Sequence, residues 1–329
     1  MELIELIKAA IIGIIQGITE WLPISSTGHM ILADEFIQLN VSLEFWEMFL
    51  VVVQLGSICA VIVLYFRKLN PFARSKSREQ RRKTWMLWAK VVVACIPAAI
   101  AGILLDDWFT EHFHNAITVA IALVVYGVAF IVVERIKGPD KPSAIIGKHS
   151  LEAVRARTAG VEDAGNAQSA LQSMLPKTQH SKRKGSNAVS DVDQLSFGRA
   201  LGIGAFQVLA IVPGTSRSGS TILGGRILGV SREAAAEFSF FLAIPVMFGW
   251  SMLKFVRGFI LGDLVPTTTE WGVLAVGVIV AFVVSIFAIR FLMGYIRKHS
   301  FEIFGWYRIV LGVVVLIFFA VTGQLLTIQ

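Results

Sequence analysis

The sequence predicts an all-α polytopic membrane protein with an inverted-topology repeat, about six transmembrane helices and two re-entrant helical hairpins. Three observations support this class. Hydrophobic residues make up 55% of the 329 residues, the mean hydropathy is +0.69, and one polar pattern occurs twice between apolar stretches. Soluble domains are rarely so apolar, so the composition argues against an ordinary soluble enzyme.

The repeated pattern relates two segments that lie 191 positions apart. Matching residues are identical in the two copies: Ile12 and Ile203, Gly13 and Gly204, Gln16 and Gln207, Ser25 and Ser216, Gly28 and Gly219, Ile31 and Ile222, and Leu32 and Leu223. A fixed shift of this kind indicates an internal repeat. The chain therefore divides into a first repeat, 1–137, an insertion, 138–196, and a second repeat, 197–329.

The first repeat begins with two apolar segments within residues 1–36, each too short to cross about 30 Å of hydrocarbon, on either side of a turn. This arrangement predicts a re-entrant hairpin. Three spans follow, at residues 45–66, 85–105 and 117–133. The loop 67–90 carries nine Lys or Arg against one Glu, so the positive-inside rule places it in the cytoplasm.

The insertion is rich in Ser, Ala, Gly, Gln and Lys. This composition predicts a flexible cytoplasmic loop, with one short helix around Leu151 to Arg157. The second repeat contains a hairpin at 199–230 and spans at 236–256, 271–292 and 305–321. Because each repeat has three spans, an odd number, the two repeats must be inverted with respect to each other.

The charge pattern predicts a multi-pass membrane protein with both termini outside. Four basic residues are assigned to the surroundings of the last cytoplasmic connection: Arg290, Arg297, Lys298 and Arg308. Basic residues of this kind explain the net charge of +7 without a nucleic-acid partner. The first residues lack a basic region and a cleavage site, so no removable signal peptide is expected.

A polar segment at residues 16–29 carries an acid, four hydroxyls and an imidazole between apolar stretches. Polar groups at membrane depth need internal partners or a ligand, so this segment is a candidate site. Gln16 and Glu20 are four residues apart and share one helix face. Pro23 ends this helix. The next residues are N-cap types, and a helix that starts there can bind phosphate: Ser25, Ser26 and Thr27.

The second copy of the pattern places Arg217 in a run of hydroxyl residues between Pro213 and Thr221. Arginine binds phosphate oxygens in bidentate geometry. An unpaired charge is costly at membrane depth, so we expect Arg217 to be functional. The serines have a second interpretation, as helix caps and small packing residues. Glu20 also has a second interpretation, as a structural ion-pair partner of Arg217.

Together these motifs resemble those of the undecaprenyl-diphosphate phosphatase family, membrane enzymes also known for bacitracin resistance. The first family motif pairs Glu or Gln with Glu, as Gln16 and Glu20 do, and continues with the Ser-Ser-Thr-Gly-His turn of residues 25–29. The second motif, Pro-Gly-x-Ser-Arg-Ser-x-x-Thr, matches residues 213–221. The resemblance covers nearly the whole chain outside the insertion.

The resemblance implies hydrolysis of a polyprenyl diphosphate to the monophosphate and inorganic phosphate, which recycles the lipid carrier of cell-wall synthesis. The candidate catalytic residues are Glu20, Ser26, His29 and Arg217. The candidate phosphate-binding residues are Ser25, Thr27, Gly28, Gly214, Ser216, Ser218 and Thr221. The resemblance also implies a divalent cation, Mg²⁺ with Ca²⁺ as the alternative, near Glu20 and Gln16. His29 is a candidate base or nucleophile, and Ser26 is the alternative nucleophile.

The sequence departs from the family pattern at two positions. Many relatives carry Glu where this chain has Gln16, and many carry an acid where it has Leu50. Glu47, about one helical turn before Leu50, is a candidate substitute. Glu237 lies 190 positions later, at nearly the equivalent place in the second repeat, and either glutamate is a candidate to face the site.

Other functions fit parts of the pattern. Broken helices in inverted repeats are typical of transporters, so a polyprenyl-phosphate flippase is an alternative, which phosphate release would distinguish. The other membrane lipid phosphatase family requires an Arg-Pro pair that this chain lacks and a His where it has Leu223. Glu111, His112 and His114 are interpreted as a solvated loop cluster rather than a metal site. The expected partners are the lipid substrate and membrane lipids, and a homo-oligomer is left open.

Overall fold

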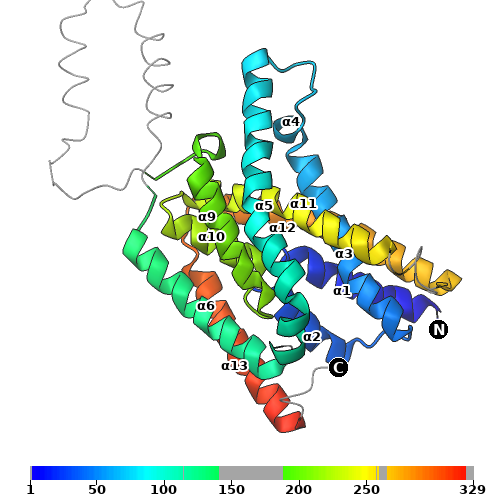
Figure 1. The fold of residues 1–329 in the computed structure, drawn as a ribbon. Helices are drawn as coiled ribbons and strands as arrows, with labels where there is room; N and C mark the ends of the chain where they lie inside the picture. Colours follow the sequence, from blue (N-terminus) through cyan, green and yellow to red (C-terminus); the bar gives the residue numbers. More distant parts are fainter. Residues whose placement is uncertain (1, 114, 141–187, 257, 259–264, 324–329) are drawn as a thin grey trace, which may run out of the picture. The chain divides into compact units, whose positions relative to one another are not determined.

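The computed structural model describes residues 2–113, 115–140, 188–256, 258 and 265–323 (Figure 1). The described helices belong to one compact unit, formed by residues 1–139 and 189–329. Most of the predicted insertion, including the short helix expected at Leu151 to Arg157, lies outside the described residues.

Six helices in the described part of the chain are long and apolar enough to cross a membrane. They are α3 (Leu43–Leu64), α5 (Arg78–Phe113), α6 (Ala116–Lys137), α11 (Arg232–Phe255), α12 (Thr268–Ile296) and α13 (Glu302–Thr322). Each overlaps one of the six predicted spans over nearly the whole length of that span, which confirms the all-α polytopic class. Their apolar faces supply most of the buried residues of the core.

The two predicted hairpins are pairs of shorter helices joined by turns. The first consists of α1 (Glu2–Thr19) and α2 (Ser26–Phe36). The second consists of α9 (Phe197–Val208), the 3₁₀ turn η2 (Leu209–Ile211) and α10 (Arg217–Ile227). With 11 residues each, α2 and α10 are too short to cross the hydrocarbon of a membrane.

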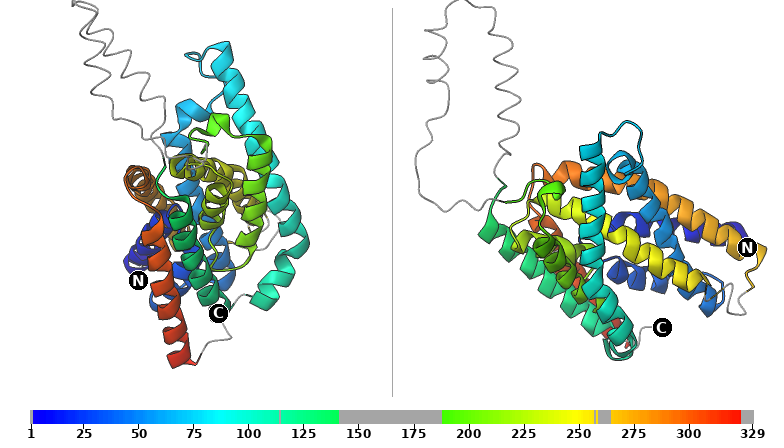
Figure 2. Two further views of the ribbon diagram at one scale, coloured as in Figure 1. Left: turned by 90° about the vertical axis from the view of Figure 1, so that its left-hand side faces the viewer. Right: turned by 45° about the horizontal axis from the view of Figure 1, so that its top comes forward.

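The two halves of the chain exchange packing partners in the same way. Helix α1 of the first hairpin packs on α12, and α9 of the second hairpin packs on α5. Each hairpin therefore packs against the middle span of the other half. Helices α6 and α13 lie side by side (Figures 1 and 2). A Cβ on Gly127 would lie 2.6 Å from the carbonyl oxygen of Gly305, and one on Gly305 would lie 2.7 Å from that of Gly127. Glycine at both positions therefore permits the close approach of α6 and α13.

The end of the predicted insertion belongs to this packed unit. Val189 pairs with the backbone on both sides of Val230, accepting from Ser231 N and donating to Gly229 O. Val192, in the 3₁₀ turn η1 (Val192–Gln194), and Leu195 are buried in the main hydrophobic cluster. These contacts fix the chain just before α9 begins.

Candidate active site

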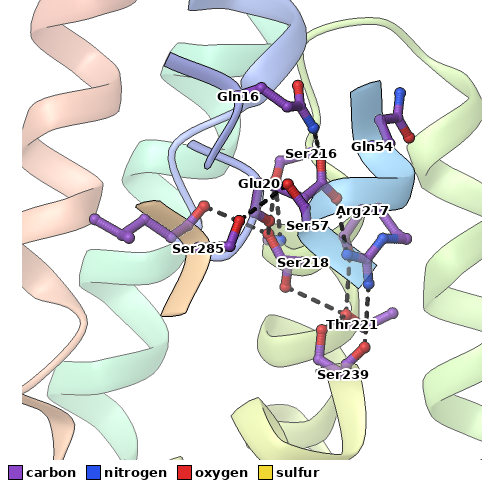
Figure 3. A network of polar contacts seen from close by, with 12 residues as sticks. Gln16, Glu20, Gln54, Ser57, Ser216, Arg217, Ser218, Thr221, Ser239 and Ser285 are labelled. Atoms are coloured by element: carbon purple, nitrogen blue, oxygen red, sulfur yellow. Dashed lines mark hydrogen bonds and ion pairs between the residues drawn. The ribbon is translucent and has the colours of Figure 1, made fainter. Parts of the chain in front are cut away.

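The site is built where the turns of the two hairpins meet. Ser218, in the first turn of α10, donates its hydroxyl to the carbonyl oxygens of Glu20 at 3.1 Å and Leu22 at 3.4 Å (Figure 3). Both carbonyls belong to the turn that follows α1. Hydroxyl groups bonded to turn carbonyls satisfy backbone groups that have no water available at membrane depth. The two halves of the chain are therefore joined by polar contacts at this point.

Each turn ends in a serine with the same unusual backbone. Among the described residues, Ser25 and Ser216 are the non-glycine residues with positive φ, at 74° and 69°. Ser25 Oγ accepts from the backbone N–H of Gly28 at 3.3 Å, and Ser216 Oγ accepts from that of Gly219 at 3.2 Å. Both serines are thus N-caps, and their positive φ carries strain that the surrounding contacts must offset. The structure favours the capping interpretation for these two hydroxyls.

An ion pair connects the two halves beside the turns. Arg217 Nη2 donates to Glu20 Oε1 at 2.9 Å, and Gln16 Nε2 donates to Glu20 Oε2 at 3.0 Å (Figure 3). Arg217 Nη1 donates to the carbonyl of Ser239 in α11 at 3.1 Å. The guanidinium also lies 5.8 Å from the ring centroid of Trp21. The side chains of Glu20 and Arg217 are almost fully buried, so their attraction is screened little by solvent.

Further hydroxyls hold the arginine in place. Thr221 Oγ1 donates to the carbonyl of Arg217 at 2.9 Å and lies 2.6 Å from Ser239 Oγ. Ser216 Oγ and Ser218 Oγ are 3.2 Å apart. Ser239 was missed in the sequence, although a buried serine in an apolar span is a signal for such a contact. The hydroxyls of Ser218 and Thr221 therefore position the backbone around Arg217.

A cavity of about 390 Å³ opens beside these groups. Gln16, Ser26 and Thr27 line it, together with two acids that lie on different helices, Asp34 in α2 and Glu47 in α3. The remaining lining is Gln54 and a set of apolar side chains: Met30, Ile31, Leu43, Trp46 and Leu50. The cavity therefore combines hydroxyl and carboxylate groups with an apolar wall.

The two equivalent glutamates differ in their surroundings. Glu47 lines the cavity, as does Leu50. Glu237 instead accepts from Lys68 Nζ at 2.9 and 3.0 Å, beyond the C-terminal end of α3. Of the two candidates, only Glu47 lies on this cavity.

His29, one of the two candidate nucleophiles, is hydrogen-bonded to groups other than Ser26, the alternative. Its Nδ1 lies 2.7 Å from the carbonyl oxygen of Ser25, and its Nε2 lies 2.7 Å from the hydroxyl of Tyr307 in α13. A carbonyl only accepts, so Nδ1 carries the proton and a neutral ring accepts at Nε2 from Tyr307. The two rings also stack, with centroids 5.6 Å apart. The structure does not bring His29 into hydrogen bonding with Ser26, and it adds Tyr307 to the residues that sequence reasoning missed.

Comparison with known proteins assigns the family. A family model described as "Bacitracin resistance protein BacA" matches residues 9–314, which include both hairpin turns and the cavity. The chain belongs to the BacA family. Curated relatives named undecaprenyl-diphosphatase include one from Enterococcus faecalis, 47% identical over 309 residues, which covers 94% of this chain and 95% of the relative. Another, from Acetivibrio thermocellus, is 49% identical over 318 residues, with 96% and 98% covered.

A second buried arginine, Arg308, binds the two turns of the BacA site. Arg308 was assigned to the surroundings of the last cytoplasmic connection, but it lies inside α13 and is 0% exposed. It donates to the carbonyls of Gly214 and Thr215 at 2.9 Å each and of Pro23 at 3.3 Å. Carbonyls freed by both turns need donors, and one guanidinium serves all three. An arginine within the apolar run of the last span was the available signal.

Glu111 and His112, two members of the predicted loop cluster, lie at the C-terminal end of α5. Glu111 is exposed, and His112 bonds through Nδ1 to the carbonyl of Trp108 at 2.9 Å. His114 lies outside the described residues. Within the described ranges, no group of three or more His, Cys, Asp or Glu side chains is placed to hold a metal ion.

Proposed function

We propose that this BacA-family protein hydrolyses undecaprenyl diphosphate to undecaprenyl phosphate and inorganic phosphate, and so contributes to recycling of the carrier lipid and to bacitracin resistance. The relatives named undecaprenyl-diphosphatase match over nearly the whole chain, including the site. The observation that carries the proposal is the buried pair of Arg217 and Glu20 at the meeting point of two turns, beside a hydroxyl-lined cavity.

The residues suit the cleavage of a phosphoric anhydride. Arg217 offers a fixed positive charge for the phosphoryl oxygens, whose negative charge must be stabilised in the transition state. Of the two candidate nucleophiles, Ser26 is favoured because it lines the cavity, whereas both ring nitrogens of His29 are already bonded. In this scheme Ser26 Oγ gives up its proton and bonds to the terminal phosphorus, the bridging P–O bond breaks, and undecaprenyl phosphate leaves with that proton on its departing oxygen. Water then hydrolyses the phosphoserine, which restores the Ser26 hydroxyl and releases inorganic phosphate.

The cavity suits a hard divalent cation such as Mg²⁺, with Ca²⁺ as the alternative. Its donors are carboxylate, amide and hydroxyl oxygens, which these ions prefer. Gln16, which lines the cavity, and Glu20, to which Gln16 donates at 3.0 Å, would hold the ion. Asp34 and Glu47 bring two carboxylates to the cavity wall. The ion would supply neutralisation of phosphate charge, and most of its coordination would come from water and substrate.

The charge distribution supports a site that opens to the outer face of the bacterial plasma membrane. The cavity is lined by the N-terminal half of α3, between Leu43 and Gln54. The basic segment 67–90 follows the opposite, C-terminal end of the same helix. By the positive-inside rule that end is cytoplasmic, so the cavity and both chain termini are assigned to the outside.

Phosphate release from undecaprenyl diphosphate by the purified protein tests the proposal. We expect release that stops with a chelator and returns with Mg²⁺ or Ca²⁺, and that Arg217→Ala slows at least about tenfold. A protein that moves the lipid across reconstituted vesicles without releasing phosphate would establish the flippase alternative instead. Release that is unchanged by the chelator would refute the cation requirement alone.

A further inference from the structure

A second cavity, of about 300 Å³, lies between α4 (Phe66–Leu69) and the first turns of α5. Both elements can be followed in Figure 1. The charged side chains on its wall are four cations and one acid: Arg67, Lys68, Lys76, Lys83 and Asp193. Ser75, Gln80 and Thr84 add neutral donors. It lies beyond the C-terminal end of α3, so it is separate from the catalytic cavity at the other end of that helix. This composition is that of an anion site.

Two of the four cations are already neutralised by neighbouring acids. Lys68 Nζ pairs with Glu237 at 2.9 Å, and Lys83 Nζ pairs with Glu79 at 2.9 Å. Asp193 also lines the cavity, and Asp191 Oδ1 lies 3.8 Å from Lys68 Nζ. The other two cations, Arg67 and Lys76, have no carboxylate within ion-pair distance among the residues that the structure describes. These two are therefore available to an anion.

Lys76 is held with one donor to spare. Its Nζ donates to Thr84 Oγ1 at 2.7 Å and to the carbonyl of Lys68 at 2.9 Å. An ammonium group has three N–H donors, so one is left for a ligand. Burial lowers the pKa of Lys76 against the smaller opposing effect of Asp193. Burial thus disfavours the charged ammonium group, and a bound anion would stabilise it.

Exposed aromatic side chains on the segments that form the cavity indicate a membrane surface. Phe72 and Trp85 are 75% and 53% exposed, and their rings contact edge to face with centroids 5.6 Å apart. Phe66, at the start of α4, is also exposed. Exposed aromatic rings of membrane proteins gather at the level of the lipid headgroups. Basic pockets between helices at that level, on the cytoplasmic side, bind anionic headgroups.

From these observations we propose that the cavity binds the phosphate group of an anionic membrane phospholipid in the leaflet at the basic end of the molecule. Arg67 and the free N–H of Lys76 bind the phosphate oxygens. The ring pair of Phe72 and Trp85 lies against the adjoining part of the lipid. Free inorganic phosphate offers the same chemistry without the apolar part, so the test separates the two sources.

The test measures phosphatidylglycerol bound to the purified full chain by native mass spectrometry after extraction from bilayers of phosphatidylcholine and phosphatidylglycerol. The variant Arg67→Gln with Lys76→Gln removes the two cations of the cavity that have no ion-pair partner among the described residues. It should lower phosphatidylglycerol affinity at least about tenfold, because charge-assisted hydrogen bonds are lost. The matched control is Arg81→Gln with Arg82→Gln, which removes two exposed charges of α5 that do not line the cavity. The control should bind lipid as the wild type does.

Three results would overturn the proposal: equal loss of lipid in the control, unchanged lipid in the cavity variant, or displacement of the lipid by inorganic phosphate alone. The last would assign the cavity to free phosphate. Phosphate release from undecaprenyl diphosphate, assayed in phosphatidylcholine alone, verifies that both variants fold. If the double variant does not fold, Arg67→Gln alone, at an exposed position, gives the same comparison against Arg81→Gln.

Discussion

Ser216 repeats the backbone conformation of Ser25, with φ of 69° against 74°, although the two residues lie in different halves of the chain. Each accepts from the backbone N–H of a glycine three residues later. Positive φ is disfavoured for residues with a Cβ atom. Positive φ occurs at the last residue of both turns. This indicates that the turns need this backbone geometry so that α2 and α10 begin where the two turns meet.

The strain at Ser216 predicts an unusual order of substitutions. Ser216→Ala loses the cap and keeps the Cβ at positive φ, whereas Ser216→Gly loses the cap but removes the strain. At Ser216 we expect the alanine variant to be less stable than the glycine variant. This alanine-to-glycine difference in unfolding free energy should exceed the difference at an ordinary cap by at least about 1 kcal/mol. Ser42, the N-cap of α3 with φ −66°, is the control. Thermal unfolding in detergent measures both pairs, and equal alanine-to-glycine differences at the two sites would contradict the argument.

Arg308 is expected to position the turns rather than to touch substrate. Arg308→Lys keeps the charge, but a single ammonium group cannot reach all three carbonyls that the guanidinium serves. Losing one such bond should destabilise the protein by about 1.5–3 kcal/mol and lower the turnover number more than it raises KM. Arg290→Lys, at an exposed position of α12, should change neither quantity. A melting temperature and a turnover number equal to those of the wild type in Arg308→Lys would refute this positioning role.

The sequence was sufficient for the helices and for the pairing of the two polar segments, because hydropathy and the repeat are local or periodic signals. It was not sufficient for the contacts that depend on how the halves pack. Tyr307 and Ser239 meet the site from helices distant in sequence, and no spacing rule connects them to His29 or Thr221. Arg308 was misplaced because charge counting treats a basic residue near a span end as a loop residue.

The repeat provides a matched pair of glutamines. Gln16 donates to Glu20, while its counterpart Gln207 is buried and its side-chain amide has no hydrogen-bond partner among the described residues. Gln16→Leu should lower the phosphate-release rate about tenfold by freeing Glu20 from a bond. Gln207→Leu should keep that rate and should not lower the melting temperature, because an unsatisfied buried amide costs about 1–3 kcal/mol. A similar loss of activity in both variants would show that the two sites are not distinguished in this way.

The topology can be tested with a single reporter. In a variant without Cys59 and Cys95, a cysteine introduced at Ser77 should resist an impermeant thiol reagent added outside intact cells, because the segment 67–90 is predicted to be cytoplasmic. A cysteine introduced at Ser42, at the N-terminal end of α3, should react. The opposite labelling pattern would invert the assignment of the catalytic cavity to the outer face.

The pair of Glu20 and Arg217 allows a decisive test of catalysis against structure. If Arg217 binds the diphosphate through its planar guanidinium, Arg217→Lys keeps the charge but loses the paired geometry, and Arg217→Ala loses both. Losing one or two charge-assisted bonds in the transition state should cost roughly tenfold to ten-thousandfold in rate, and lysine should rescue little.

The double change Glu20→Gln with Arg217→Gln removes both buried charges together. If the pair were only structural, this variant should regain activity, because no uncompensated charge is left buried. The catalytic role instead predicts a protein that melts close to the wild type and releases no phosphate above background. Measuring both quantities on the same preparation separates the outcomes, and near-normal turnover in the double variant would refute the assignment of both residues.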